Sequence, residues 1–308
     1  MGLIDVLGDF HMADQNSRTT GFSRREFMTR SLGGLAAGMV AGVPSIIRGV
    51  EDPQSRIPLA VQLFSVHDVA AKDLAGTLKE LANWGVKGVE FAGTYGYDPE
   101  EIRQLLEETG LVAVGAHLSL TDILGDAFFA TVRCYKTFRT GALIVTGGMG
   151  NALASDGGNQ FAAYLFSELN RKAVGAGFRL GFHSHAVDFV TMEDGSSAWD
   201  LFFSRSTPDL IAEMDVGNAL DSGGDPYSSM EKFPGQGRLI HLKASKPDGT
   251  LIGGAGDEVD WQRVFQICEN VAGTKWYIVE QEGGGPETDS MNALYQSIEN
   301  LRKIHSFA

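Results

Sequence analysis

The chain has 308 residues, of which 43% are hydrophobic and 39 are glycine, and it carries a formal net charge of −14. This is the composition of a globular protein, and the length allows one large α/β domain or two smaller ones. Nucleic-acid-binding proteins are usually basic or carry a basic stripe, so no nucleic-acid partner is expected.

The first 50 residues predict an export signal and a short linker. Residues 23–28 read Ser-Arg-Arg-Glu-Phe-Met, and the small-residue apolar run SLGGLAAGMVAGV follows them. This pattern resembles the twin-arginine (Tat) consensus, and the run is too short for a stable membrane anchor. We expect cleavage after Gly42 and a periplasmic protein, with membrane association only if the signal is retained.

From residue 57 on, short apolar runs alternate with amphipathic helical patterns. One of the helical patterns has a complete set of boundary signals: Asp98 suits the N-cap, Pro99 the first position, Glu101 the capping box and Gly110 the end. The apolar runs number eight and recur roughly every 25–40 residues: 57–65, 86–92, 111–118, 142–148, 178–185, 210–217, 238–244 and 275–281.

Eight strand-and-helix units predict a parallel sheet. That number favours a closed (β/α)8 TIM barrel, a single domain over residues 51–308, rather than a doubly wound sheet. No Gly-x-Gly-x-x-Gly follows the first strand, which argues against a dinucleotide-binding fold. Cys134 and Cys268 lie far apart among apolar residues, so two buried thiols are expected rather than a disulfide.

Polar residues stand at the ends of most of the predicted strands, where the active site of such a barrel forms. Charged groups there are costly to bury unless they are paired or bound to metal, so together they predict one shared polar site. The residues are Glu90, His117, His183, His185, Asp215, Asn218, His241, Lys243, Glu280 and Glu282.

His183 and His185 are two residues apart on one strand, so both should point into the barrel. Asp215, His241 and Glu280 from the next three strands would complete a ring of ligands. Imidazoles and carboxylates without thiolates suit a divalent metal such as Mn²⁺, Zn²⁺, Co²⁺ or Fe²⁺.

Each residue also has a structural alternative when it is taken alone. His117 could be a buried histidine bonded to the backbone, Asp215 could cap a loop, and Lys243 could be a solvated loop residue. Metal binding or catalysis explains the whole set at once, whereas the structural alternative needs a separate reason for each residue.

In these segments the chain resembles the xylose isomerase-like TIM barrels of the sugar phosphate isomerase/epimerase superfamily, over roughly residues 57–305. GFHSH…DF, EMDVGN, GRLIHLKA, GAGDEVDW and YIVEQE are similar to family segments on the fifth to eighth strands. Asp188 stands where Glu is usual, and Ala244 replaces an Asp. The resemblance implies four metal ligands: His183 (Glu in many relatives), Asp215, His241 and Glu280.

The resemblance implies a metal-dependent sugar isomerase or epimerase. The metal polarises a carbonyl and stabilises the enediolate that forms when the adjacent proton leaves. The expected base is His185 or Glu90, with Glu282 less favoured, and Lys243 would supply positive charge to the oxyanion. The expected substrate contacts are His117, Asn218 and Glu282.

Other functions stay open. Loss of a β-leaving group from the same enediolate would make the protein a lyase or dehydratase acting on a keto-sugar or keto-glycoside. Export and negative charge favour an unphosphorylated sugar, although the Gly283–Gly285 run could cradle a phosphate or form a flexible lid. An endonuclease IV-like phosphodiesterase and a non-catalytic sugar-binding protein are less favoured. A homo-oligomer is also open.

Overall fold

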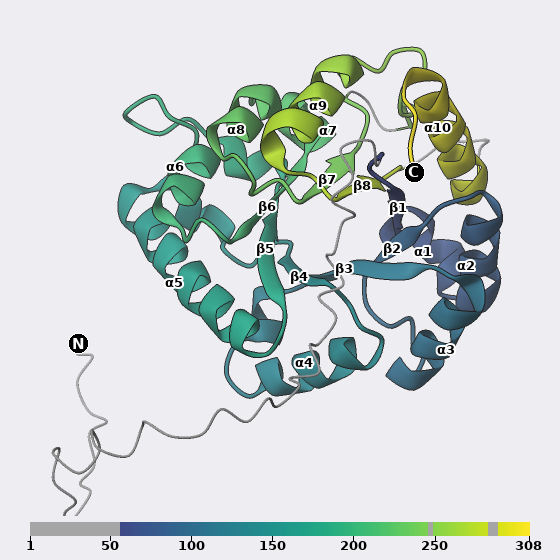
Figure 1. The fold of residues 1–308 in the computed structure, drawn as a ribbon. Coiled ribbons are helices and arrows are strands. Elements are labelled where there is room, and N and C mark those ends of the chain that lie inside the picture. Colours follow the sequence, from purple (N-terminus) through teal and green to yellow (C-terminus); the bar gives the residue numbers. More distant parts are fainter. Residues whose placement is uncertain (1–55, 246–248, 283–288) are drawn as a thin grey trace, which may run out of the picture. The chain divides into compact units, whose positions relative to one another are not determined.

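In the computed structural model, residues 56–245, 249–282 and 289–308 are described, and within them eight parallel strands close into a barrel. Strand order follows the sequence, and β8 returns to pair with β1, where Val61 lies opposite Val279. Figure 1 shows the helices arranged around these strands. The predicted (β/α)8 barrel is confirmed. The twin-arginine segment and the Gly283–Gly285 run lie outside the described residues.

Each strand lies inside one of the eight predicted apolar runs and is shorter than the run. Some of the residues beyond the strands are buried in the connecting turns, as Leu63 is. The strands are β1 (Leu59–Gln62), β2 (Gly88–Phe91), β3 (Val112–Leu118), β4 (Ala142–Val145), β5 (Arg179–His183), β6 (Ile211–Asp215), β7 (Leu239–Leu242) and β8 (Trp276–Val279).

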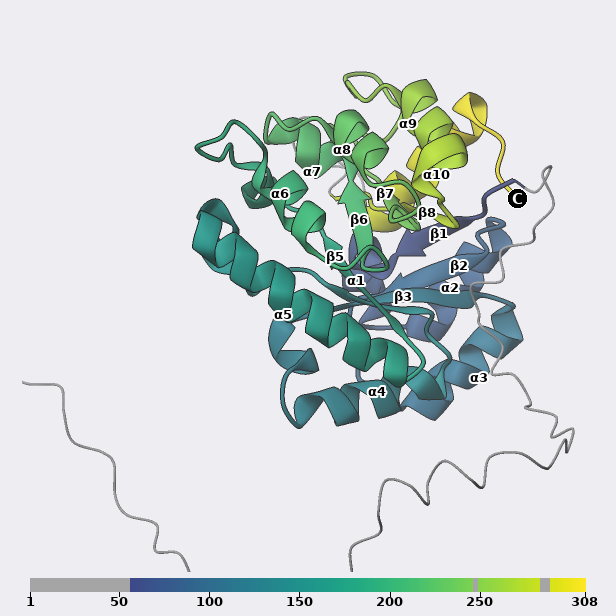
Figure 2. The same cartoon turned by 60° about the vertical axis from the view of Figure 1, so that its left-hand side comes forward.

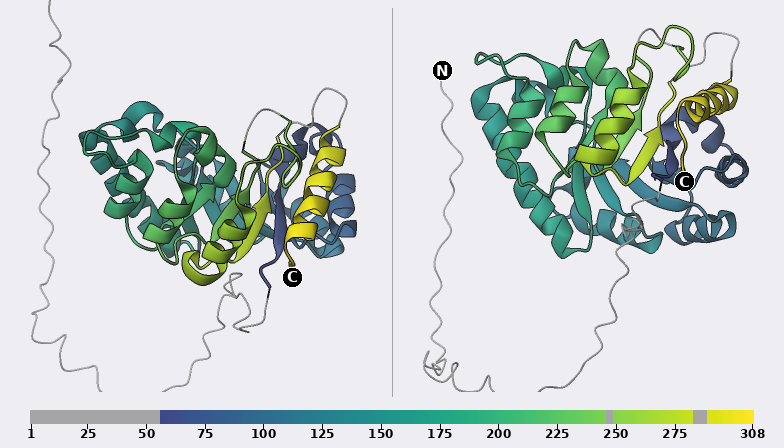
Figure 3. Two further views of the ribbon diagram at one scale, coloured as in Figure 1. Left: turned by 90° about the horizontal axis from the view of Figure 1, so that it is seen from above. Right: turned by 45° about the horizontal axis from the view of Figure 1, so that its top comes forward.

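The helices form a ring outside the barrel, which Figures 2 and 3 show from other sides. Short turns η1 (Leu63–Val66), η2 (Leu120–Ile123), η3 (Gly150–Ala154) and η4 (Ala186–Phe189) follow the first and the third to fifth strands. A π-helical turn, η5 (Cys268–Ala272), extends α9. The helices are α1 (His67–Ala70), α2 (Leu74–Asn83), α3 (Pro99–Thr109), α4 (Ala127–Thr137), α5 (Asp156–Gly175), α6 (Ala198–Arg205), α7 (Val216–Asp221), α8 (Pro226–Lys232), α9 (Trp261–Ile267) and α10 (Ser290–Ile304).

Helix α3 begins and ends where its sequence signals predict. The Asp98 carboxylate accepts a hydrogen bond from the backbone N–H of Glu100 at 2.9 Å, and the Glu101 carboxylate accepts one from the backbone N–H of Asp98 at 2.9 Å. Gly110 ends the helix with φ 72°, a conformation that glycine adopts without steric cost.

The main core lies between the barrel and the helices. Its largest fully buried side chains include Phe91, Phe166, Phe182, Trp199 and Phe202. In the described part of the chain, no helix is long and apolar enough to cross a membrane. The chain end returns to the start of β1, where the backbone N–H of Ala308 donates to the carbonyl oxygen of Ile57 at 3.4 Å.

The two cysteines are free thiols, as predicted. Cys268 is buried, as expected, but Cys134 is half-buried at the surface of α4. The prediction of two buried thiols is therefore wrong for Cys134. An amphipathic helix presents its flanking positions to solvent even where the local sequence is apolar.

Candidate metal centre inside the barrel

The interior of the barrel changes from apolar to polar along the strands. Near their N-terminal ends, an apolar cluster that includes Ala60, Ile211, Leu239 and Ile278 fills the barrel. Side chains two positions further along a strand point the same way, one layer higher. Those next inward positions hold polar residues: Gln62, Glu213, His241 and Glu280.

Four residues at the C-terminal ends of β5 to β8 form what we call the outer set: His183, Asp215, His241 and Glu280. One ligand atom from each lies within 4.8 Å of the others, and all four side chains are buried. Nδ1 of His241 lies 2.5 Å from Oε2 of Glu280, and Nε2 of His183 lies 3.9 Å from Oδ2 of Asp215. The structure thus brings together the four residues predicted as metal ligands.

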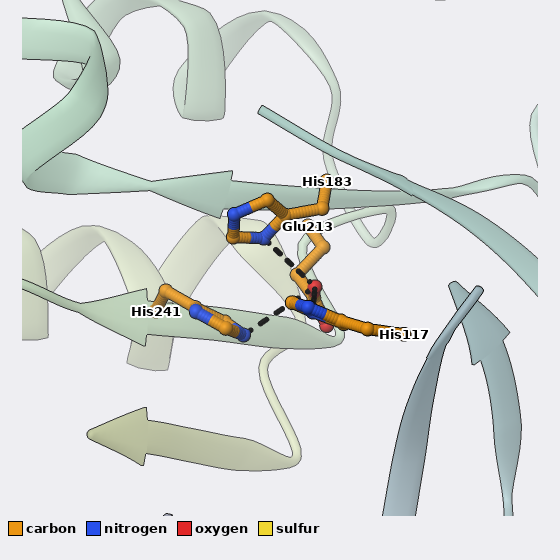
Figure 4. A group of neighbouring side chains, drawn as sticks. All are labelled: His117, His183, Glu213 and His241. Atoms are coloured by element: carbon orange, nitrogen blue, oxygen red, sulfur yellow. Dashed lines mark hydrogen bonds and ion pairs between the residues drawn. The ribbon is translucent and has the colours of Figure 1, made fainter. Parts of the chain in front are cut away.

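A second group lies one layer deeper, and we call it the inner set: His117, His183, Glu213 and His241 (Figure 4). Oε2 of Glu213 lies 2.9 Å from Nε2 of His117, 3.0 Å from Nδ1 of His183 and 3.4 Å from Nε2 of His241. Three imidazoles therefore converge on one carboxylate oxygen. His183 and His241 belong to both sets.

Glu90 borders the inner set on the side of β2. Its Oε2 accepts from Nε2 of Gln62 at 2.9 Å and lies 2.8 Å from Nε2 of His241 and 3.0 Å from Nε2 of His117. Its other oxygen, Oε1, lies against Gly115, where an added methyl group would be only 2.2 Å away. The glycine on β3 thus makes room for the buried carboxylate.

Burial raises the pKa of two carboxyl groups in this site. The pKa of Asp215 rises to about 7 because burial outweighs the nearby charge of Lys243. The pKa of Glu213 also rises to about 7, because burial and the charge of Glu90 disfavour a second anion. Without a further positive charge, the protein holds these two groups partly protonated at neutral pH.

Histidines reverse the effect of burial on the other two acids. Burial opposes ionisation of Glu280, but the hydrogen bond and charge of His241 outweigh it and lower the pKa to about 2. His117 and His241 likewise lower the pKa of Glu90 far below its usual range. In return, the pKa of His241 rises well above its usual value despite burial, and that of His117 rises to about 10.

The outer set fits a divalent cation. Oδ2 of Asp215 is buried and has no hydrogen-bond partner, which is costly for a carboxylate oxygen unless another group binds there. Two imidazoles and two carboxylates form a donor set that suits Mn²⁺, Fe²⁺, Co²⁺ or Zn²⁺. A cation at this position would neutralise the charge that burial disfavours.

A cavity of about 310 Å³ opens beside the outer set. This is the size of a small-molecule site. Its walls combine apolar and polar groups: Phe64, Ala92, His117, Leu118, Ser119, Thr146, His183, His185, Glu280 and Glu282.

His185 faces this cavity from the turn after β5. Its ring centre lies 5.0 Å from that of His183, and its backbone N–H donates to Oδ2 of Asp188 at 2.8 Å. Burial lowers the pKa of the His185 imidazole, outweighing the nearby charge of Glu280. A neutral imidazole at the cavity wall can accept a proton.

Lys243 and Glu282 lie at the mouth of the outer set. Nζ of Lys243 lies 2.8 Å from Oε2 of Glu282 and 3.8 Å from carboxylate oxygens of Asp215 and Glu280. Lys243, predicted to stabilise the oxyanion, and Glu282, predicted to contact the substrate, therefore both adjoin the site.

Two other predicted residues lie away from the cavity wall. Nδ2 of Asn218 donates to the carbonyl oxygen of Ser184 at 3.1 Å, so this amide holds the end of β5. Glu90 lies fully buried beneath the outer set, which favours His185 over Glu90 as the base. His117 lines the cavity, and its Nε2 faces the buried carboxylates.

Glu213 and Gln62 were not predicted as site residues. Glu213 stands two residues before Asp215 on β6 and so points to the same side of the sheet. The spacing argument that pairs His183 with His185 would have identified it. Gln62 has no comparable signal, because a single amide at the end of an apolar strand is common.

No protein-family model and no curated protein matches the chain. Among solved structures, it is similar to a sugar phosphate isomerase/epimerase from Parabacteroides distasonis, with 18% identity, 82% of this chain and 98% of that chain covered, and a TM-score of 0.70. It is also similar to IolI with a bound zinc atom (11%, 80% and 96%, TM-score 0.60). The probable 3-DHS dehydratase AsbF from Bacillus anthracis is similar too (16%, 80% and 99%, TM-score 0.58). At these identities the likeness establishes the fold.

Proposed function

We propose that the chain is an exported, metal-dependent enzyme that isomerises or epimerises an unphosphorylated sugar or keto-sugar. The observation that carries the proposal is the outer set, with its buried, unpartnered Asp215 oxygen, together with the cavity of sugar size that two of its members, His183 and Glu280, line. The sugar phosphate isomerase/epimerase and the zinc-bound IolI on the same fold support it.

The chemistry follows from the groups around the cavity. A divalent cation held by His183, Asp215, His241 and Glu280 would act as a Lewis acid on a substrate oxygen. His185 would take the proton next to the substrate carbonyl and, in an isomerisation, return it to the neighbouring carbon, because it is neutral and faces the cavity. Lys243 would add positive charge beside the developing oxyanion.

Elimination of a β-leaving group is the second candidate. It needs the same proton abstraction, and the similarity to a probable 3-DHS dehydratase supports it. The two reactions differ only in where the electrons go after the proton leaves. A phosphodiesterase acting on nucleic acid is disfavoured, because a chain with net charge −14 repels polyphosphate.

Metal analysis of the full chain tests the proposal. Wild type should hold about one divalent transition metal per chain, and Asp215→Asn should lose it while keeping its fold. Asp126→Asn is the control, because Asp126 is exposed on the protein surface and lies outside both sets. A fully folded wild type that binds no metal after reconstitution with Mn²⁺, Co²⁺ or Zn²⁺ would contradict the proposal.

Substrate screening then separates the two reactions. Keto-sugars and glycosides are incubated with loaded enzyme in deuterated water. Deuterium in an isomeric sugar identifies isomerisation or epimerisation, and release of the leaving group identifies a lyase. His185→Gln should lose exchange but keep its metal, because it removes the base and leaves the outer set intact.

A further inference from the structure

The two histidines that belong to both sets present one ring nitrogen to each. His183 directs Nε2 toward Asp215 and Nδ1 toward Glu213, at 3.9 and 3.0 Å. His241 does the reverse: Nδ1 faces Glu280 at 2.5 Å, and Nε2 faces Glu90 at 2.8 Å. The nitrogen that points to the outer set is therefore a different one in each ring.

The inner set could in principle hold a second cation, since its donor atoms also lie within 4.8 Å of one another. The hydrogen bonds argue against this. Both shared imidazoles would have to give up both ring protons to bind two cations. A single oxygen of Glu213 already receives three imidazole nitrogens within 3.4 Å. Oε1 of Glu213, like Oδ2 of Asp215, is buried without a hydrogen-bond partner, so it is the two shared imidazoles that argue against a second cation.

The inner carboxylates are themselves fixed in place. The Gln62 amide donates to Glu90, and the Gly115 backbone leaves room for the other oxygen of Glu90. Nε2 of His117 lies between the two acids, 3.0 Å from Glu90 and 2.9 Å from Glu213. These contacts hold Oε2 of Glu213 against Nδ1 of His183 and Oε2 of Glu90 against Nε2 of His241.

We propose that Glu213 and Glu90 are positioning residues that hold the two shared histidines in opposite tautomers. Glu213 keeps a proton on Nδ1 of His183 and leaves Nε2 free to bind the cation. Glu90 keeps a proton on Nε2 of His241 and leaves Nδ1 free. A carboxylate that accepts the second N–H fixes the ring orientation and makes the other nitrogen a stronger ligand. This inference rests on the proposed metal site.

The direct test reads the tautomers by nuclear magnetic resonance. The full chain is labelled with ¹⁵N-histidine, loaded with the diamagnetic ion Zn²⁺, and studied by long-range ¹H–¹⁵N correlation. One zinc-bound ring should be protonated on Nδ1 and the other on Nε2. Glu213→Gln should perturb the first ring and Glu90→Gln the second, which also assigns the signals. Two zinc-bound rings with the same tautomer would overturn the proposal.

Zinc affinity gives an independent readout, measured by competition with a chelator. Glu213→Gln and Glu90→Gln should each weaken zinc binding by about 10–100-fold and keep one zinc per chain at saturation. Asp200→Asn is the matched control, because Asp200 is a buried carboxylate on α6 that pairs with Lys232. Its zinc affinity should equal that of wild type.

The outcomes separate this inference from the proposed function. A wild type without zinc overturns both. If wild type holds one zinc and Glu213→Gln and Glu90→Gln leave the zinc affinity and the tautomers unchanged, only the inference is overturned. Two zinc ions per chain, one of them lost in Glu213→Gln, would also overturn it and assign a second cation to the inner set.

Discussion

At the scale of single residues, Asp188 links the stability of the protein to pH. It lies buried in η4, and burial raises the pKa of its carboxyl group from 3.8 to about 6, although the N–H of His185 opposes the rise. The folded protein therefore binds more protons than the unfolded chain between about pH 4 and pH 6. The free energy of unfolding falls as pH rises through this window.

Asp188→Asn removes the buried charge and keeps an oxygen that can accept the His185 N–H. One unit of pKa shift is worth about 1.4 kcal/mol, so the gain above pH 7 is at most about 3 kcal/mol. We expect a Tm above that of wild type at pH 8 and no difference at pH 4, measured by thermal unfolding across pH.

The control for this prediction is Asp225→Asn, an exposed N-cap of α8 that accepts from the N–H of Ser228 at 3.0 Å. Its Tm should not rise above that of wild type at pH 8, because an exposed carboxylate carries no cost of burial. An Asp188→Asn variant that is less stable than wild type at pH 8 would show that the ionised carboxylate stabilises the turn.

The residues of the site were predictable to the extent that strand periodicity applies. His183, Asp215, His241 and Glu280 follow from their types and their places at strand ends, and the structure brings them together. Predicting the place of Glu90 would have required knowledge of a contact across the barrel. Sequence position says that it points inward, but only the structure shows that it lies beneath His241.

At the scale of elements, α3 depends on its capping box. Replacing Asp98 by alanine leaves the N–H of Glu100 without its side-chain acceptor, and such caps are worth about 1 kcal/mol. In a chain of this size that corresponds to a fall in Tm of about 2–4 °C. Thermal unfolding of Asp98→Ala by circular dichroism measures it.

A matched variant comes from the next helix. Asp126 occupies the N-cap of α4 but makes no side-chain capping hydrogen bond, so Asp126→Ala should leave Tm unchanged. Equal losses in the two variants would mean that the capping box contributes nothing and that removal of surface charge explains both.

Element boundaries were predictable where a local signal sets them. The beginning and end of α3 follow from Asp98, Pro99 and Gly110, because they supply a side-chain cap, a fixed φ for the first turn and tolerance of a positive φ. The strand ends did not follow, since residue type alone does not mark where the hydrogen-bond ladder stops. The run at 142–148 was expected as one strand, yet β4 ends at Val145.

At the scale of the whole molecule, the barrel was predictable because the number of strand-and-helix units favours it over a doubly wound sheet. Eight strand-and-helix units are the number of a closed barrel, and the pairing of β1 with β8 completes the hydrogen-bond ladder. The outer set draws one residue from each of four consecutive strands. It therefore exists only after that side of the barrel has formed.

Because the outer set exists only in the folded barrel, the predicted export route determines where the metal can bind. A metal bound before export can be carried across the membrane only if the barrel crosses in its folded state, as the twin-arginine route allows. We expect that lysine in place of both Arg24 and Arg25 abolishes export of the full chain, because the paired arginines are the signal's defining feature. Cell fractionation and immunoblotting measure the periplasmic share.

Arg18→Lys is the control, since it changes an arginine of the same segment outside the pair. It should be exported like wild type, and the Arg24/Arg25 variant should collect in the cytoplasm as folded, metal-loaded protein. Equal periplasmic amounts of the two variants would contradict the prediction that the arginine pair directs export. The metal would then have to be acquired outside the cytoplasm by a chain that closes its barrel there, and the metal content of periplasmic protein would follow the metal supplied in the medium.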